Sequence, residues 1–494
     1  MTIGLVEPLA GRTVPTALEA MARRRPDAPA IVSPAGTIGF AALVGAIERR
    51  AAWLMSNGLQ PGMSAGLVMD DSPTDLIAFL ALFRLGVAVL PISADEAPAE
   101  RRMLLDAVGA VACIGKSACR APGESRWIDM EAFGDGDPHI LPPPPGPDDR
   151  AHYNRSSGTT LGQPKIIAIS HGQRADRVVR EAAGFVGPGD RLLHIVPLVN
   201  SFSRGVVLAT LASGGTLVFP PAELSFAVLG SVLAENGVTA MALTPPLVRD
   251  MLRNPREGRL LPGVRLMVGT APLPVAQRLE ARRRLTPLLF IHYATNETGP
   301  LAIATPADLD ADPRCAGRAT TGVEAQVVDD RSRALPPGAM GALRVREAGF
   351  PDDYVFAPAG SASRFVEGWF YPGDAATMDE AGRITIHGRI DDVINVGGRK
   401  VHPSAIEAWL AADPRVVEAA AVGMRAQRMG EVPMAAVVLR APATEAELLD
   451  LCRSAGGGLP LPRRILVLPE LPRNAAGKID RRRLVALFTA QFGS

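Results

Sequence analysis

Residues 156–165 read SSGTTLGQPK, a run of hydroxyl and glycine residues that ends at Lys165 just before the apolar stretch IIAIS. Small residues let backbone N–H groups converge on an anion, hydroxyls add donors and the lysine adds positive charge. The run is not a Walker A loop, because Gly162 is followed by Gln-Pro-Lys rather than by a Lys-Ser or Lys-Thr pair. Taken alone, it fits a phosphate-binding loop and an ordinary surface loop equally well. A P-loop kinase or NTPase is disfavoured.

Lysine is scarce in this chain. The 52 basic residues include only four lysines, which are Lys116, Lys165, Lys400 and Lys478. A lysine carries a compact charge on a slim stem, whereas arginine is a wide planar fork. Each lysine is therefore a candidate for a chemical role that an arginine could not fill. Lys116 lies in no motif and is assigned to the surface.

The composition limits the class of protein. The chain has 494 residues, 47% of them apolar and 21% charged, with a formal net charge of +1. This indicates a globular protein of two or three domains and argues against a nucleic-acid partner. The four cysteines form no C-x-x-C pair, so neither a zinc site nor a disulfide framework is expected. The N-terminus lacks a signal-peptide pattern, and the most apolar segment, residues 76–92, contains Arg84 and Gly86. We therefore expect a cytoplasmic protein with no membrane span.

The elements that must position these residues alternate between helical and strand periodicity. Two predicted helices (residues 41–58 and 75–86) alternate with two predicted strands (64–69 and 87–93), a rhythm that favours a mostly parallel sheet. The rhythm resumes beyond the connector LPPPPGP. Short strands then predict a small β-rich subdomain, followed by an α+β mixture. The expected fold class is α/β, with a large N-terminal domain of parallel-sheet subdomains plus the β-rich subdomain (1–390) and a small α+β C-terminal domain (391–494).

Six segments, in order over nearly the whole chain, resemble motifs of the adenylate-forming superfamily: acyl-CoA synthetases, aryl-acid ligases, peptide-synthetase adenylation domains and luciferases. Any one match alone could be chance, but six in sequence could not reasonably be. They are an early helix–strand element (79–93), the phosphate loop S-G-T-T-G-x-P-K (156–165), the Y-G-x-T-E motif (IHYATNETG, 291–299), the G-D motif (GWFYPGD, 368–374), the G-R-x-D-D segment (387–407) and the P-x-x-x-x-G-K-x-x-R motif (471–484).

The resemblance implies a ligase that activates a carboxylic acid with ATP to an acyl-adenylate, releasing pyrophosphate. A thiol of CoA, or of the phosphopantetheine of a separate carrier protein, would then take the acyl group and release AMP. Both reactants of the first step are anionic, so the catalyst must neutralise charge and align the attack. By resemblance, the β- and γ-phosphates are held by Ser156, Ser157, Gly158, Thr159 and Thr160, with Lys165 nearby.

The resemblance also implies roles in nucleotide and metal binding outside that loop. Glu297 would bind Mg²⁺, a hard cation that prefers oxygen ligands and substrate phosphates. Tyr293 would stack on adenine, and Asp374 would accept hydrogen bonds from the ribose hydroxyls. Arg389 would brace the ribose or a phosphate.

Lys478 is the residue implied to reach both the substrate carboxylate and the α-phosphate side of ATP, where a slim point charge fits between two anions. The family's C-terminal domain is mobile and is expected to swing about a hinge at Asp391. That swing would exchange Lys478 for the 392–401 loop, in which Gly397 and Gly398 let a pantetheine arm pass close to the backbone. Lys400 occupies the basic position of that loop, although the neighbouring arginine could fill the same role.

Three departures from the family pattern affect these expectations. The phosphate loop contains one extra residue, most simply Leu161, and Ala294 replaces the usual glycine of the Y-G-x-T-E motif. Asn296 replaces the threonine that normally touches the α-phosphate. An amide can still donate a hydrogen bond, so Asn296 stays a catalytic candidate and altered rather than abolished activity is expected. The alternative is a degraded nucleotide-binding paralogue that acts as a scaffold.

The segment PLVNSFSRG (197–205) bears on the acid. An ungapped alignment places Asn200 at a histidine of acyl- and aryl-CoA ligases; a one-residue gap places it where aryl-acid ligases use Asn and amino-acid-activating relatives use Asp. Neither alignment supplies an aspartate to pair with an α-ammonium group, which is costly to bury unpaired. An α-amino acid is therefore disfavoured, and an aryl acid is slightly favoured over a fatty acid. Further pocket candidates are Phe202, Thr244, Gly269 and Thr270.

Overall fold

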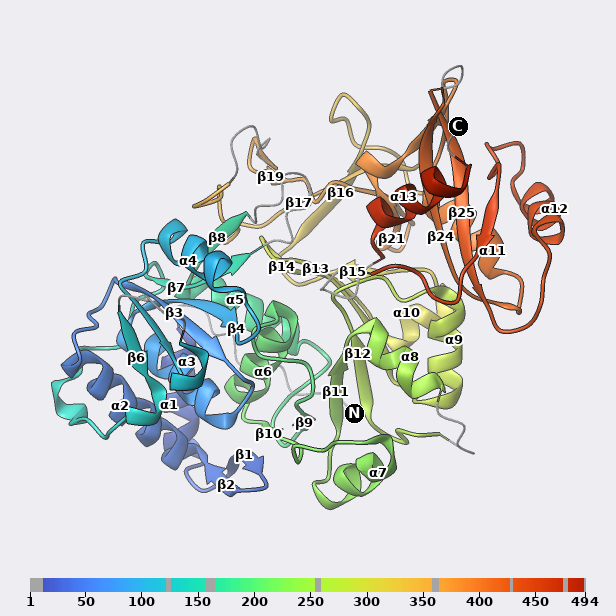
Figure 1. The fold of residues 1–494 in the computed structure, drawn as a ribbon. Helices are drawn as coiled ribbons and strands as arrows, with labels where there is room; N and C mark the ends of the chain where they lie inside the picture. Colours follow the sequence, from blue (N-terminus) through green and yellow to red (C-terminus); the bar gives the residue numbers. More distant parts are fainter. Residues whose placement is uncertain are drawn as a thin grey trace.

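The computed structural model describes residues 12–120, 126–155, 165–253, 259–357, 364–426, 430–473 and 479–492. These residues form three β-sheets with helices packed around them (Figure 1). The expected α/β fold class is confirmed: both N-terminal sheets contain a parallel part, the β-rich region is antiparallel, and the C-terminal region has a separate sheet. No helix in these ranges is long and apolar enough to cross a membrane.

The first sheet has six strands in the order β6-β5-β3-β4-β7-β8, parallel except for the antiparallel pair β7–β8. Its strands are β3 (Ser64–Met69), β4 (Ala88–Ser93), β5 (Ala112–Gly115), β6 (Trp127–Asp129), β7 (Arg150–Arg155) and β8 (Ile166–Ser170). The helices of this region are α1 (Val14–Arg24), α2 (Phe40–Ser56), α3 (Pro73–Leu85) and α4 (Pro98–Ala107). The last strands, β7 and β8, flank the predicted phosphate loop, whose residues 156–164 lie outside the described residues.

Local sequence explains why α3 forms where it does. The Ser72 side chain accepts from the backbone N–H of Asp75, and the Asp75 carboxylate accepts from the N–H of Ser72 at 2.9 Å, which makes a capping box. Pro73 occupies the first turn, where its missing N–H costs nothing. Gly86 ends the helix in the left-handed conformation, with φ of 75°. These signals are contiguous in the chain, which is why the helix could be predicted.

The second sheet joins the remaining parallel strands to the β-rich region. Its order is β18-β19-β17-β20-β21-β15-β14-β13-β12-β11-β9-β10-β1-β2, with β16 on β17. The parallel part and its edge consist of β1 (Pro29–Ser33), β2 (Gly36–Gly39), β9 (Arg191–Leu193), β10 (Thr216–Val218), β11 (Ala240–Leu243), β12 (Arg265–Val268) and β13 (Leu289–Thr295). The accompanying helices are α5 (His171–Ala182), α6 (Ser201–Ala212), α7 (Phe226–Glu235), α8 (Pro245–Arg253) and α9 (Val275–Arg284).

The β-rich region continues this sheet through the antiparallel pair β13–β14, instead of forming a sheet of its own. It still has its own apolar cluster, which includes Leu301, Leu343 and Phe370. The elements are β14 (Gly299–Ala304), α10 (Pro306–Ala311), β15 (Gly317–Ala319), β16 (Glu324–Val328), β17 (Gly341–Arg346), β18 (Phe365–Val366), β19 (Trp369–Phe370), β20 (Asp374–Met378) and β21 (Arg383–Arg389). The 3₁₀ turn η4 (Ile390–Asp392) leads out of it.

The third sheet lies entirely after Asp391, with helices on both faces. Alternate residues of β24 enter different clusters: Ala421 packs with α11 and α12, whereas Val422 packs with α13, as the two-residue period of a strand requires. The elements are β22 (Ile394–Val396), β23 (Arg399–Val401), α11 (Pro403–Ala411), β24 (Val416–Ala426), β25 (Gly430–Leu439), α12 (Glu445–Ala455), β26 (Ile465–Val467) and α13 (Arg481–Phe492). The domain boundary at 390/391 stays a prediction.

Three buried histidines are expected to make the protein less stable in mild acid. Burial lowers the pKa of His171 and of His292 to about 4, and lowers that of His152 well below its usual value. The unfolded chain binds these protons near pH 6.5, so stability is full above pH 6.5 and is lost as the pH falls toward 4. Each of the first two contributes about 3 kcal/mol of this loss. Urea unfolding between pH 7.5 and 4.5 measures it.

The matched variants for this measurement are His171→Phe and His139→Phe. His171 is buried against the ring of Phe83, whereas His139 is exposed. Replacing the buried histidine is expected to flatten the fall of the unfolding free energy with acid, because one proton-binding group of the unfolded chain is gone. Equal slopes for the two variants would contradict the assignment of the effect to burial.

Candidate active site

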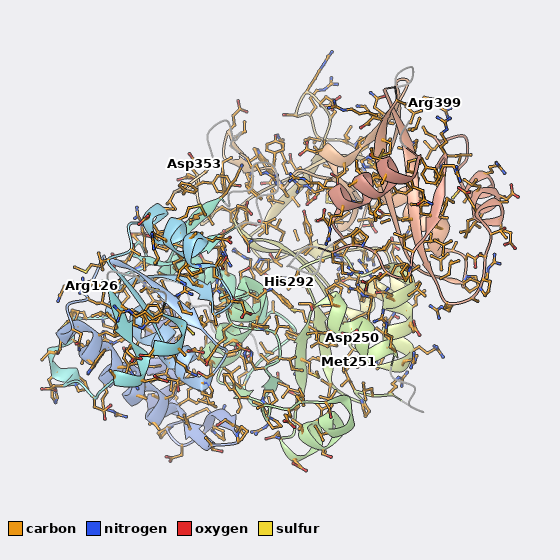
Figure 2. The ribbon with its side chains drawn as sticks, viewed as in Figure 1. Arg126, Asp250, Met251, His292, Asp353 and Arg399 are labelled. Carbon is orange, nitrogen blue, oxygen red and sulfur yellow. The ribbon has the colours of Figure 1, made fainter. Side chains whose placement is uncertain are left out.

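The Y-G-x-T-E-like motif forms the hairpin between β13 and β14. Strand β13 ends at Thr295, and β14 begins at Gly299, whose φ of 74° lies in the left-handed region that glycine tolerates. The three residues between them make the turn at the carboxyl end of the last parallel strand. Figure 2 shows the neighbouring His292 near the centre of the molecule, between the N-terminal sheets and the β-rich region. This hairpin is the structural centre of the candidate site.

Asn296 connects this turn to two other elements. Its Nδ2 donates to the carbonyl oxygen of Arg155 at 2.8 Å, and its Oδ1 accepts from the Ser201 hydroxyl at 2.6 Å. Arg155 is the last residue of β7, directly before the predicted phosphate loop, and Ser201 begins α6. The Asn296 carbonyl accepts from Asn154 Nδ2 at 3.0 Å. Asn296 therefore fixes the end of β7 relative to the motif, a positional role that the sequence did not reveal.

Two buried arginines of α5 donate hydrogen bonds to the backbone carbonyls of the same turn. The Arg177 guanidinium donates to the carbonyl of Asn296 at 3.2 Å and also to that of Glu297, and Arg180 donates to the carbonyl of Thr298 at 3.3 Å. Burial holds the pKa of Arg177 well below its usual value, with repulsion from nearby Arg174 acting in the same direction. Buried carbonyls need such donors, since an unpaired one costs about 1–3 kcal/mol. The arginines thus fix the backbone that carries Glu297.

Glu297, the predicted Mg²⁺ ligand, is nearly buried and contacts a tyrosine from another region. Glu297 is 7% exposed to solvent, and its Oε1 accepts a hydrogen bond from the Tyr354 hydroxyl at 2.8 Å. Lys165, the lysine that ends the phosphate-loop motif, places its Nζ 4.7 Å from the centroid of the same ring. Backbone pairing between Phe356 and Ile166 holds the two segments together. The predicted phosphate lysine and metal carboxylate thus meet at Tyr354, which sequence reasoning missed.

The electrostatics at Tyr354 agree with a half-buried, hydrogen-bonded phenol. Burial raises the pKa of Tyr354, and the charge and hydrogen bond of Glu297 raise it further. Burial also lowers the pKa of Lys165, with repulsion from Arg364 adding to the effect. The phenol is therefore a neutral donor to the carboxylate at physiological pH.

The predicted nucleoside residues are adjacent in space. The Tyr293 hydroxyl on β13 donates to Asp374 Oδ2 at 2.5 Å, and Arg389 donates to Asp374 Oδ1 at 3.3 Å. Burial raises the pKa of Asp374, while the bonds from Tyr293 and Arg389 oppose the rise. Gly373 permits this packing: a Cβ there would lie 2.6 Å from the Arg389 guanidinium. Tyr293, Asp374 and Arg389 come together from three strands.

Three acid-pocket candidates lie near His292 of β13: Phe202 is on α6, and Gly269 and Thr270 directly follow β12. The rings of Phe202 and His292 are 5.0 Å apart, and a Cβ on Gly269 would lie 2.8 Å from the Phe202 ring, so glycine allows that ring to rest on the backbone. Thr270 follows with a φ of 76°, a strained conformation for a β-branched residue. His292 was not predicted from the sequence. Both of its ring nitrogens are buried and have no hydrogen-bond partner among the described residues.

The two other pocket candidates lie at the N-termini of helices. The Asn200 side chain is the N-cap of α6 and accepts from the backbone N–H of Phe202 at 2.9 Å. Thr244 lies directly before α8, and its carbonyl accepts from the N–H of Val248 at 3.1 Å. Asn200 Oδ1 is thus engaged by its own helix, and the role of Asn200 in the acid pocket stays a prediction.

The candidates of the thiol-arm loop lie away from this site, whereas Asp391 follows Arg389 by two residues. Asp391 is in η4, and Gly397 and Gly398 form the two-residue turn between β22 and β23, with φ values of 58° and 89° that suit a Gly-Gly hairpin. Lys400 is exposed on β23, and Figure 2 shows its neighbour Arg399 far from His292. The structure therefore does not bring the thiol-arm loop to the candidate site. Lys478 and the predicted phosphate-binding residues 156–160 lie outside the described residues.

Comparison with known proteins assigns the chain to a family. The model of the AMP-binding enzyme family matches residues 18–354, and that of the AMP-binding enzyme C-terminal domain matches residues 405–478. The chain belongs to the AMP-binding enzyme family. The resemblance to the adenylate-forming superfamily seen in the sequence is confirmed.

Relatives align over almost the whole chain. It is 31% identical to indoleacetate–CoA ligase of Aromatoleum aromaticum, covering 93% of this chain and 96% of that protein. It is 32% identical to 4-chlorobenzoate–CoA ligase of an Arthrobacter species, covering 94% and 93%. Among solved structures it is similar to ATP-bound MatB of Rhodopseudomonas palustris, with a TM-score of 0.84, 25% identity and coverage of 96% and 99%. The similar proteins named here include ligases of aromatic acids.

Proposed function

We propose that this AMP-binding enzyme activates a carboxylic acid, with an aryl acid favoured, and transfers the acyl group to the thiol of CoA. The observation that carries the proposal is the junction at the β13–β14 hairpin. There Tyr293 is bonded to Asp374, and Glu297 lies beside Tyr354 and Lys165. The two relatives named above are both CoA ligases of aromatic acids, which supports CoA as the thiol acceptor and an aryl acid as the substrate.

The first half-reaction joins two anions, so positioning and charge neutralisation are the tasks of the protein. A carboxylate oxygen of the acid attacks the α-phosphorus, the bond from that phosphorus to the β-phosphate oxygen breaks, and pyrophosphate leaves. Asp374 would accept the ribose hydroxyls, Tyr293 would lie against adenine, and Lys478 would contact the carboxylate and the α-phosphate. Asn296 has one N–H left to donate toward the α-phosphate, since only one is used by Arg155.

Glu297 fits the Mg²⁺ expected for this chemistry. No group of three or more His, Cys, Asp or Glu side chains in the described ranges forms a metal cage. Mg²⁺ is commonly held by one or two carboxylates together with substrate phosphates, so a single buried carboxylate near Tyr354 and Lys165 suits it. When bound, the ion supplies charge neutralisation at the phosphates. Tyr354 keeps the carboxylate oriented by donating to one of its oxygens.

In the second half-reaction a thiol sulfur attacks the acyl carbon of the adenylate. The bond between that carbon and the phosphate oxygen breaks, AMP leaves, and the thiol proton is released. We propose that the loop at Gly397 and Gly398 enters the site for this step after rotation at Asp391. The arrangement in Figure 2, with Arg399 distant from His292, is then the one that precedes thiol attack.

A panel of acids tests the proposal. Pyrophosphate release is measured with indoleacetate, 4-chlorobenzoate, benzoate, a fatty acid and an α-amino acid, each with and without CoA. We expect release with at least one aryl acid, a CoA-dependent thioester, and no response to the amino acid. A phosphopantetheinylated carrier protein in place of CoA tests the other acceptor. Intact ATP binding without acid-dependent release would reject the enzyme and leave the scaffold alternative.

The hydroxyl of Tyr354 is expected to matter for the metal rather than for the fold. Tyr354→Phe keeps the ring against Lys165 but leaves Glu297 Oε1 without its donor. A hydrogen bond to a charged group contributes about 1.5–3 kcal/mol, so we expect the half-saturating Mg²⁺ concentration to rise about tenfold. The measurement is Mg²⁺ titration of nucleotide binding by calorimetry. Tyr371→Phe removes a phenol whose recorded hydrogen bonds are to Arg344 and Ser332 and serves as the control; equal titrations for the two variants would contradict the role.

A further inference from the structure

Glu418 on β24 lies between two arginines from opposite sides of the predicted domain boundary. Arg473 donates to both carboxylate oxygens of Glu418, at 2.7 and 2.8 Å. Arg249 on α8 places a guanidinium nitrogen 3.3 Å from the same carboxylate. The side chains of Arg249 and Glu418 are each only 12% exposed, so this charge cluster is largely shielded from solvent and salt.

The two ion pairs differ in what they connect. Glu418 and Arg473 both belong to the C-terminal region, so their pair persists however that region is placed. Arg249 belongs to the N-terminal region, and its helix begins directly after Thr244. Figure 1 shows α8 and α9 beside the C-terminal sheet, and Gln277 of α9 donates to the carbonyl of Val417 at 3.5 Å. Unlike the Glu418–Arg473 pair, the Arg249–Glu418 pair therefore depends on how the C-terminal region is placed against α8.

Residues on both sides of the 474–478 segment are tied to the C-terminal region. The backbone of Arg473 pairs with that of Ile479. After the segment, Arg481 on α13 donates to Glu407 at 2.9 Å and lies 3.6 Å from Asp392, one residue beyond the predicted hinge. Glu418 thus holds the residue that enters the segment containing Lys478, and it contacts the N-terminal region through Arg249.

We propose that Glu418 is a positioning residue whose pair with Arg249 holds the C-terminal region in the arrangement that serves adenylate formation. The inference rests on the proposed function, because it assigns Lys478 to the first half-reaction and the Gly397–Gly398 loop to the second. Breaking the pair removes a stabilising contact from one arrangement and from no other. The equilibrium between arrangements therefore shifts away from adenylate formation.

Arg249→Met isolates this pair. Methionine keeps an unbranched apolar stem of similar length, and Glu418 retains both bonds to Arg473, so no carboxylate is left without a partner. Arg253→Met is the matched control: the same charge is lost from the same helix, but Arg253 is exposed and pairs with Asp250 of its own turn at 3.4 Å.

Two activities and one structural readout are measured on the full-length chain. Exchange is measured with the acid of the panel that gives the highest activity. We expect Arg249→Met to lower acid-dependent ATP–pyrophosphate exchange about tenfold. CoA thioester formation from supplied acyl-adenylate should be unchanged or faster. In Glu418→Gln, where the pair is already weakened, adding Arg249→Met should cost much less. Amide hydrogen exchange at the start of β24 should be faster in Arg249→Met than in Arg253→Met.

The outcomes separate this proposal from the proposed function. Equal loss of both half-reactions, or hydrogen exchange at β24 identical in the two variants, would overturn the positioning role of Glu418. If the unmodified protein shows no acid-dependent exchange with any acid while β24 still exchanges faster in Arg249→Met, the ligase proposal fails and the interdomain role of the pair stands.

Discussion

Replacing Glu297 with glutamine is expected to lower acid-dependent ATP–pyrophosphate exchange by about 10²- to 10³-fold, the size of effect seen when one stabilising electrostatic contact is removed from a transition state. Glutamine is nearly isosteric and can still accept from the Tyr354 hydroxyl, so the local packing is kept. What it loses is the negative charge that Mg²⁺ requires. The loss is measured as exchange rate against Mg²⁺ concentration, at saturating acid.

The control for Glu297→Gln is Glu324→Gln. Glu324 lies on β16, is about half exposed and pairs with Arg346 at the surface, so its charge is expected to contribute little. Thermal unfolding should be unaffected in the control and close to unaffected in Glu297→Gln. An unchanged Mg²⁺ dependence in Glu297→Gln would remove this residue from the metal site and would require a ligand elsewhere, within or beyond the described residues.

The elements around this site could be predicted because their signals are local. A capping box, an N-terminal proline and a C-terminal glycine lie within 15 residues of one another at α3, and short apolar runs mark the parallel strands. The order of the motifs also led correctly to the family. Tyr293 and Asp374, 81 residues apart, could be grouped from the resemblance, although nothing in either local sequence indicates that their side chains touch.

Tyr354, Arg177 and Glu418 could not be found in this way. Each acts through contacts that are distant in the sequence: Tyr354 reaches Glu297 over 57 residues, and Arg177 reaches Asn296 over 119. Arginine is also the ordinary surface cation of this chain, so the composition does not indicate which arginines are buried. Its position beneath the motif turn depends on how α5 packs on β14, which is a property of the assembled fold.

Asn296 shows how structure changes the meaning of a motif departure. In the sequence, an asparagine in place of threonine supports both altered activity and a degraded paralogue. In the structure, its amide joins Arg155 at the end of β7 to Ser201 at the start of α6. A threonine hydroxyl is too short to make both bonds. Asn296 therefore makes two contacts that a threonine could not make together, and we interpret the substitution as a way of joining the end of β7 to the start of α6.

Lys478→Ala is expected to abolish adenylate formation and to spare thioester formation from supplied acyl-adenylate. The ammonium would lie between the acid carboxylate and the α-phosphate, and a loss of about 10²–10³-fold or more is expected when that charge is removed. The thiol step should not need it, because it is assigned to the Gly397–Gly398 loop. The measurement is ATP–pyrophosphate exchange beside CoA thioester formation from purified acyl-adenylate.

Lys116→Ala is the control that the scarcity of lysine provides. Lys116 forms an ion pair with Asp70, is over a third exposed and lies in none of the six motifs. Its loss should leave both half-reactions unchanged. Arg249→Met should fall between the two lysine variants, because it shifts the arrangement that presents Lys478 without removing the charge. Equal loss of both half-reactions in Lys478→Ala would contradict the exchange of Lys478 for the glycine loop, since the two steps would then share one arrangement.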